Sequence, residues 1–232
     1  DDGLGFTFKW NLGWMNDSLS YLSEDPLFRK YRHAKLNFPL TYAFDERFVL
    51  PISHDEVVHG KRSLLGRAPG EYEQKFAGTR AFMVYMMTYP GKKLSFMGNE
   101  IAQFSEWDHE KSVDWQLLDF GMHSAFQLFS ANLNHFYLEN PALWRCDAEP
   151  QGFEWIDPNN AEWSICSYRR IDDKGRELLT VINFTPVERS DFLLAVPDDG
   201  IFEEVFNSDD LRYGGRGVHN LGKLRAEPNL LS

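Results

Sequence analysis

A group of titratable side chains follows an apolar run in the stretch FVLPISHDEVVHGKRS, residues 48–63. His54, Asp55 and Glu56 are consecutive, and His59 completes a set of four titratable side chains within six residues. Imidazole and carboxylate groups at this spacing could hold a metal ion, could act on a substrate, or could cap a turn. Each alternative requires a different backbone conformation in residues 54–59.

A metal site is the first alternative, and the spacing of the two histidines argues against it. Zinc proteases carry HExxH on a helix, which places two histidines four residues apart on one face. Here Asp55 lies between His54 and Glu56, so His54 and His59 are five residues apart. They would point about 140° apart on a regular helix. The sequence also has no Gly-rich phosphate loop, and we expect neither a metal ion nor a cofactor.

A catalytic role is the second alternative, because His54 and Asp55 directly follow a strand candidate. In parallel α/β barrels the C-terminal ends of the strands carry the reactive groups. A carboxylate there could stabilise an oxocarbenium-like centre or bind sugar hydroxyls, and an adjacent histidine could donate a hydrogen bond. Alternatively, Asp55 caps the following turn and His54 is a satisfied polar residue. Spacing alone favours this cap, since Asp is a preferred N-cap residue.

The elements that would position these residues are of two kinds. Residues 1–140 alternate between strand and helix candidates, which is typical of parallel α/β units. Residues 141–232 contain short strand-like runs between polar turns, which indicates an all-β domain. We predict strands over 5–10, 47–53 and 92–98, helices over 70–89 and 124–140, and later strands over 153–157, 161–172, 177–185, 190–197 and 202–209. Three strand-and-helix cycles cannot close an eight-stranded barrel, so residues 1–140 should be the last part of a larger α/β domain.

The composition of the 232-residue chain excludes several classes of partner. A net charge of −11 argues against nucleic acid, which attracts clustered Lys and Arg, and against an anionic membrane surface. The aromatic content of 15% is compatible with a sugar-binding surface. No run approaches the roughly 18 apolar residues of a membrane helix. The two cysteines, Cys146 and Cys166, suggest no disulfide scaffold, and we predict a reducing, cytoplasmic location.

Three long stretches, residues 3–21, 39–65 and 89–115, resemble the α-amylase-type glycoside hydrolase family, and within it the glucan branching enzymes. The resemblance implies a (β/α)8 barrel followed by a C-terminal β-sandwich. Residues 1–140 would then supply strands six to eight of the barrel, and residues 141–232 the sandwich. The sandwich would lack a further strand pair after about Leu211, and we expect the residues beyond that position to be poorly ordered.

The resemblance also implies an activity and a mechanism. Branching enzymes cleave an α-1,4-glucan chain and transfer it to a 6-hydroxyl, which forms the α-1,6 branches of glycogen. Their mechanism is retaining, with one carboxylate as nucleophile and another as acid/base. A third carboxylate, in a His-Asp pair, stabilises the transition state, and the matching residues here are His54 and Asp55. The other two carboxylates precede the matched segments in the family, so the chain resembles a C-terminal fragment that should be inactive alone.

The remaining site predictions concern glucan binding and assembly. Trp14 and Asn16 should lie at the end of the first strand, facing the mouth of a barrel, and Trp107 should follow the third strand. All three are candidate contacts to an α-glucan, although Trp14 could equally be a packed residue beside the barrel rim. An exposed part-barrel surface favours self-association. Two rival functions stay open: another enzyme of the same family, such as a debranching enzyme, and a non-catalytic glucan-binding or subunit-like protein.

Overall fold

A computed structural model describes residues 5–196 and 199–227. Its first sheet is parallel, with strand order β1-β2-β3. The strands are β1 (Lys9–Trp10), β2 (Phe48–Ile52) and β3 (Lys92–Ser95). All three predicted strands of the N-terminal segment are therefore confirmed, although each is shorter than predicted. The first is shortest because only Lys9 and Trp10 have partners on β2.

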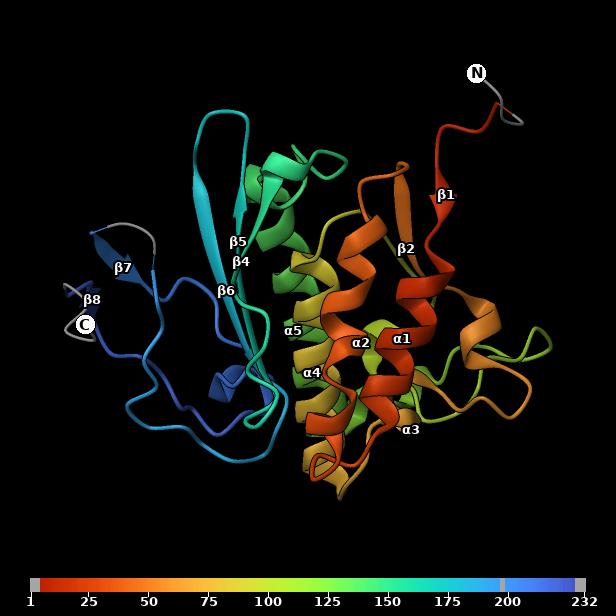
Figure 1. The fold of residues 1–232 in the computed structure, drawn as a ribbon. Coiled ribbons are helices and arrows are strands. Elements are labelled where there is room, and N and C mark those ends of the chain that lie inside the picture. The colour runs from red at the N-terminus through yellow and green to blue at the C-terminus, as the bar shows by residue number, and fades with distance from the viewer. Residues whose placement is uncertain (1–4, 197–198, 228–232) are drawn as a thin grey trace.

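Helices connect these strands and cover one side of the sheet. The two long ones are α4 (Tyr72–Thr88) and α5 (Gly121–Glu139), and the shorter ones are α1 (Leu12–Ser23), α2 (Ala34–Asn37) and α3 (Leu64–Arg67). The two predicted long helices are confirmed, with α5 starting three residues earlier than predicted. Figure 1 shows α2 and α4 on the side of the parallel strands that faces a second, antiparallel sheet. None of the helices in the described residues is long and apolar enough to cross a membrane.

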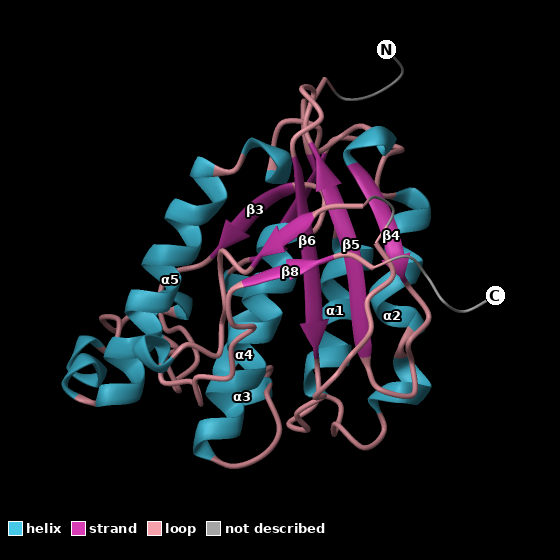
Figure 2. Ribbon diagram, turned by 90° about the vertical axis from the view of Figure 1, so that its left-hand side faces the viewer, coloured by secondary structure: helices cyan, strands magenta, loops and turns pink. Residues whose placement is uncertain are grey.

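The C-terminal part of the chain is built of antiparallel strands. The larger sheet has the order β4-β5-β6, formed by β4 (Phe153–Asp157), β5 (Ile165–Ile171) and β6 (Glu177–Asn183). It lies over the helices in the view of Figure 2. A two-stranded sheet follows, formed by β7 (Ile201–Glu203) and β8 (Lys223–Arg225). The strand predicted over 190–197 is wrong for residues 190–196, which form no strand, and residue 197 lies outside the described residues.

The helices and the antiparallel sheet share one core, which three buried arginines cross. Arg170 of β5 is fully buried and donates to the carbonyl oxygens of Thr88 and Gly152 and to Asp147 Oδ1 at 2.9 Å. Two further arginines, Arg29 and Arg80, belong to the helical part and reach toward the C-terminal part. Arg29 donates to the carbonyl oxygens of Leu22 and Phe184, and Arg80 donates to those of Ser208 and Tyr213. A buried guanidinium is tolerated only when its donors are satisfied in this way.

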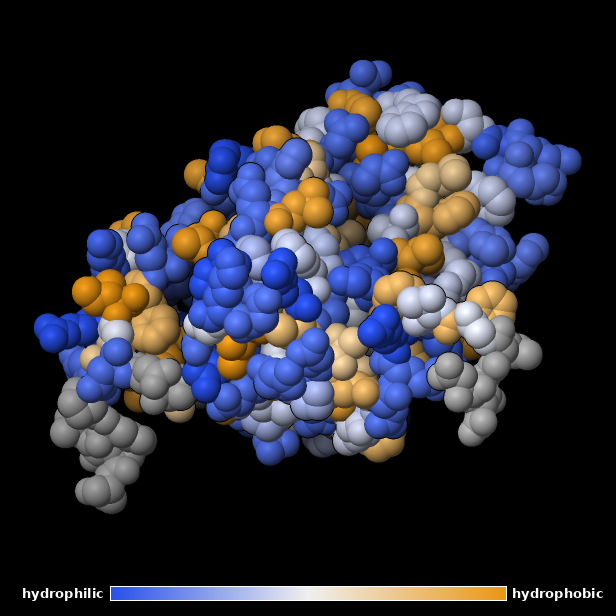
Figure 3. Space-filling view, turned by 90° about the horizontal axis from the view of Figure 1, so that it is seen from above, coloured by the Kyte–Doolittle hydropathy of each residue, from blue (hydrophilic) through white to orange (hydrophobic). Residues whose placement is uncertain are grey.

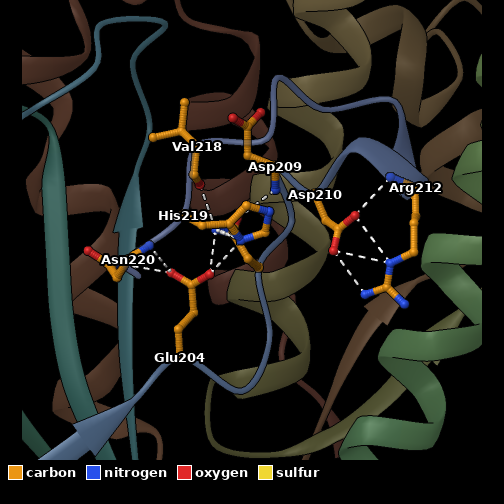
Figure 4. A network of polar contacts seen from close by, with 8 residues as sticks. Glu204, Asp209, Asp210, Arg212, Val218, His219 and Asn220 are labelled. Carbon is orange, nitrogen blue, oxygen red and sulfur yellow. Dashed lines mark hydrogen bonds and ion pairs between the residues drawn. The ribbon is translucent and has the colours of Figure 1, made fainter. Parts of the chain in front are cut away.

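The segment after β7 folds back on itself around one carboxylate (Figure 4). Glu204 accepts hydrogen bonds from the side chain of Asn207 and from the backbone and side chain of Asn220, and its Oε1 lies 2.8 Å from His219 Nδ1. Tyr213 is buried in the common core. The prediction that residues beyond Leu211 are poorly ordered is therefore wrong for 211–227, and its remainder, 228–232, lies outside the described residues.

Candidate active site

The backbone after β2 forms a capped turn that leaves Asp55 free to face outward. A short 3₁₀ helix spans His54–Val57, and Ser53 is its N-cap. The carboxylate of Glu56 accepts from Ser53 N at 2.7 Å and from Ser53 Oγ at 2.6 Å. Ser53 and Glu56 thus form a capping box. The alternative in which Asp55 caps this turn is wrong, because Ser53 already occupies that role.

His54 and Asp55 form an accessible pair at the C-terminal edge of the parallel sheet. His54 Nε2 lies 3.3 Å from Asp55 Oδ1, and the two side chains are 48% and 60% exposed. Lys61 Nζ donates to the backbone carbonyl of Asp55 at 2.8 Å. The turn is therefore fixed through its backbone, while the imidazole and the carboxylate can reach a molecule outside the protein.

Aromatic rings surround the histidine of this pair. The ring centroids of Phe96 and Trp107 each lie 5.8 Å from that of His54, and the two aromatic rings meet edge to face at 5.1 Å. Phe96 directly follows β3, so the ends of two neighbouring strands contribute to the group. Trp107 offers the flat apolar surface against which sugar rings pack, and the structure places it beside His54. Its predicted contact to a glucan stays a prediction.

The pair and the tryptophan open onto a pocket of about 600 Å³, lined by residues of segments 54–59 and 105–111. Glu106 lies in its wall, and its carboxylate accepts the backbone N–H of Gly60 at 2.9 Å and that of Arg62 at 2.6 Å. These two hydrogen bonds hold the pKa of Glu106 below its ordinary value. Asp108 has its pKa lowered in the same way, by the Glu110 backbone N–H and by the Lys111 side chain.

Two of the predicted glucan contacts do not reach this pocket. Asn11 caps α1 immediately after β1, and its side chain accepts the backbone N–H of Trp14 at 2.9 Å. Trp14 is consequently in the first turn of a helix, fully buried and stacked on Tyr85 with centroids 6.1 Å apart. The prediction that Trp14 contacts glucan is therefore wrong in this structure, which has it as a packed core residue. Asn16 is exposed on α1 but does not line the pocket.

The sequence analysis missed two members of the site. Glu106 contacts residues 44 and 46 positions earlier in the chain, and nothing local marks it. Phe96 lies inside the third predicted strand, 92–98, but the observed strand ends at Ser95, so Phe96 directly follows β3. Neighbouring parallel strands end at the same edge of a sheet, so residues directly after them meet.

Comparison with known proteins places these features in a family. Residues 155–230 match the family described as "Alpha amylase, C-terminal all-beta domain", which confirms the all-β prediction for that part. Two crystal structures share the fold at low sequence identity: an alpha-amylase from H. orenii (14% identity, TM-score 0.52, 78% of this chain and 39% of that chain) and a debranching enzyme from Nostoc punctiforme (17% identity, TM-score 0.53, 79% and 38%). At these identities the likeness shows the fold alone.

Relatives of higher identity share the name 1,4-alpha-glucan branching enzyme GlgB. The proteins from Aquifex aeolicus and Roseobacter denitrificans are each 52% identical to the chain over 97% of its length, and that from Clostridium perfringens is 50% identical over 94%. The chain covers 36%, 31% and 33% of these three proteins. It therefore spans about a third of the length of its relatives and matches their C-terminal part. Over nearly all of its length, the chain is therefore similar to the C-terminal part of branching enzymes, and its residues 155–230 match a domain of the alpha-amylases.

Proposed function

We propose that the chain is the C-terminal part of a 1,4-α-glucan branching enzyme, which transfers an α-1,4-glucan segment to a 6-hydroxyl and so forms α-1,6 branches of glycogen. One observation carries the proposal: an exposed His54–Asp55 pair lies at the C-terminal edge of a parallel sheet, beside the ring of Trp107. The relatives named above, which are branching enzymes, support the choice of reaction. The substrate would be an α-glucan such as amylose or glycogen.

In this proposal the parallel sheet is the last part of a (β/α)8 barrel. The strands β1, β2 and β3 would be its sixth, seventh and eighth, residues 1–140 its C-terminal portion, and residues 141–232 a β-sandwich domain. The order β1-β2-β3, with helices in the connections, is the arrangement that consecutive barrel strands have. Reactive groups of such barrels lie at the C-terminal ends of the strands, which is where His54 and Asp55 are found.

Asp55 would act through its charge. A retaining glycosyl transfer passes through oxocarbenium-like transition states, and it needs a nucleophilic carboxylate and an acid/base carboxylate about 5–5.5 Å apart. Asp55 would be a third carboxylate that stabilises the developing positive charge, which is worth more in a partly dehydrated site than in water. His54, 3.3 Å from Asp55, would donate a hydrogen bond to a sugar hydroxyl, and Trp107 would stack against a glucose ring.

The chain alone is proposed to be inactive. The other carboxylates of the pocket, Glu106 and Asp108, already accept backbone N–H groups and shape their loops. They are therefore poorly suited to serve as nucleophile or acid/base. Without a covalent intermediate the retaining route is closed, whatever charge stabilisation Asp55 provides.

An iodine assay on the isolated chain tests this expectation. Amylose incubated with the chain should keep its iodine absorbance, and the Asp55→Asn variant should behave identically. A fall in absorbance that Asp55→Asn abolishes would contradict the proposed inactivity, because a nucleophile and an acid/base would then lie within these residues. Binding of maltoheptaose without turnover fits both an enzyme fragment and a non-catalytic glucan-binding protein, and branching that appears when the chain is joined to the upstream part of a relative would favour the fragment.

We also propose that the isolated chain self-associates. Strand β1 is an open edge of the parallel sheet, and Phe6, Phe8, Trp10 and Leu12 on and beside it are exposed, Phe6 to 83%. Hydrophobic side chains also occur in small groups between hydrophilic ones on the face seen in Figure 3. Exposed edges and apolar patches favour association. Sedimentation velocity should show a mass that rises with concentration, and a monomer at all concentrations would refute the proposed self-association.

The cytoplasmic location predicted above stays a prediction.

A further inference from the structure

The loop formed by residues 57–62 borders the candidate active site in a conformation that needs support. His59, Gly60 and Arg62 have φ angles of 56°, 77° and 70°. A residue other than glycine in this left-handed region costs on the order of 1 kcal/mol or more, and it persists where its surroundings hold it. His59 and Arg62 both adopt this unfavourable conformation within a few residues of Asp55. Contacts from outside the loop are therefore needed to hold their backbone in place.

Glu106 supplies that support from the opposite wall of the pocket. Its two carboxylate oxygens each accept one backbone N–H of the loop, from Gly60 at 2.9 Å and from Arg62 at 2.6 Å. The next residue, Trp107, donates its backbone N–H to the carbonyl of Val57 at 2.9 Å. One dipeptide thus holds both ends of the loop. Hydrogen bonds to an ionised carboxylate are the stronger kind.

This attachment fixes the groups that would meet a substrate. Lys61 lies between the two clamped residues and donates to the carbonyl oxygen of Asp55. The Trp107 ring contacts His54. Glu106 therefore helps to hold two parts of the pocket in position. One is the turn that carries Asp55, and the other is the aromatic ring of Trp107.

We propose that Glu106 is a positioning residue of this site: its carboxylate clamps residues 57–62 and so sets the spacing between Trp107 and the His54–Asp55 pair in which a glucan would bind. The inference rests on the proposed function for the identity of the ligand. The clamp itself depends only on the geometry of the chain.

The charge of Glu106 gives the clamp a direct signature. The N–H groups of Gly60 and Arg62 lower its pKa most, and electrostatic interactions with the nearby His59 and Arg67 lower it further. Because the folded pKa is depressed, the clamp is complete at neutral pH and is released as the pH falls through the folded value. Protonation of one carboxylate should then disturb two backbone amides simultaneously.

Amide nitrogen–proton correlation spectra of the chain across an acid titration test the clamp. The Gly60 and Arg62 signals should move together, with one midpoint below the ordinary Glu value of about 4.3. Glu106→Gln should abolish this shared transition, because an amide does not titrate in this range. It should also weaken the clamp, since an amide offers one acceptor oxygen and its NH₂ group opposes the second N–H. Glu110→Gln is the matched control, because that carboxylate is 80% exposed and its ion-pair partner is the exposed His109. If the Gly60 and Arg62 amide signals of the parent chain do not move as the pH falls, the proposed clamp is refuted.

Maltoheptaose binding tests the positioning role. Glu106→Gln should weaken the affinity by roughly tenfold, in the range of one charged hydrogen bond, and should lower the melting temperature only slightly, because the loss is confined to one surface loop. Glu106→Asp, which keeps two acceptor oxygens, should recover part of it, and Glu110→Gln should bind like the parent. Equal affinity in Glu106→Gln would overturn the inference. A parent chain that binds no maltoheptaose would instead overturn the proposed glucan site, and the amide titration would still decide whether the clamp exists.

Discussion

Branching by an enzyme that carries Asp55→Asn should be about 10²–10³-fold slower than by its parent, the usual effect of removing one group that stabilises transition-state charge. The enzyme for this experiment joins the upstream two thirds of the Aquifex aeolicus relative, which is 52% identical to the chain, to the chain itself. The substitution keeps the size of the side chain and removes its charge. Because that charge matters mainly in the transition state, kcat should fall while KM changes little.

The control for this prediction lies at the other end of the same strand. Asp45 is exposed and precedes β2, whereas Asp55 follows it, so Asp45→Asn removes the same charge at the N-terminal edge of the sheet. Its rate should stay within a fewfold of the parent. The rates are measured from the reducing ends released when isoamylase removes the branches. Equal rates for the parent and Asp55→Asn would refute the role proposed for Asp55.

The largest expected loss of stability comes from Arg170→Met. The guanidinium of Arg170 is fully buried and bonded to Asp147, Thr88 and Gly152. Removing it leaves Asp147, itself 6% exposed, with Lys92 as its remaining ion-pair partner. Breaking a buried pair from one side costs about 3–5 kcal/mol. At this chain length each kcal/mol lowers the melting temperature by about 2–4 °C, which calorimetry resolves easily.

Arg169→Met provides the matched comparison, because Arg169 precedes Arg170 on β5 and points to the opposite face. Its guanidinium pairs with Glu154 and Glu177, whose side chains are 51% and 34% exposed. Ion pairs in contact with solvent contribute about 0–1 kcal/mol. Urea unfolding should therefore separate the two variants clearly. If both substitutions lower the free energy of unfolding by similar amounts, the burial of Arg170 does not explain its contribution to stability.

Much of the architecture was predictable because its signals are local. Helix α4 has a broad apolar stripe and ends before Pro90-Gly91, and both features act over a few residues. The error at Trp14 has an equally local cause. Asn11 is a preferred N-cap residue, and a helix that begins there turns Trp14 inward to stack on Tyr85. The signal was present in the sequence but was interpreted as the end of a strand.

The site divides in the same way. His54 and Asp55 were predictable from their place after an apolar strand. The S-x-x-E pattern of Ser53 and Glu56 is typical of a capping box, and it shows that Ser53, not Asp55, is the N-cap of the turn. Glu106 was not predictable, because its two hydrogen bonds join residues more than 40 positions apart. Only the fold brings these segments together, and a single sequence records no such pairing.

The three arginines that cross the common core have a consequence for how this protein can change over evolutionary time. Apart from the carboxylates of Asp147 and Asp209, the latter an ion-pair partner of Arg80 at 3.9 Å, the acceptors that these guanidinium groups use in the described residues are backbone carbonyls. Every amino acid supplies a carbonyl, so substitution at an acceptor position leaves the acceptor in place. An insertion or deletion moves it. The seam between the helices and the antiparallel sheet should therefore accept sequence drift while resisting changes in loop length, and recombination there should succeed only between parents whose loops match residue for residue.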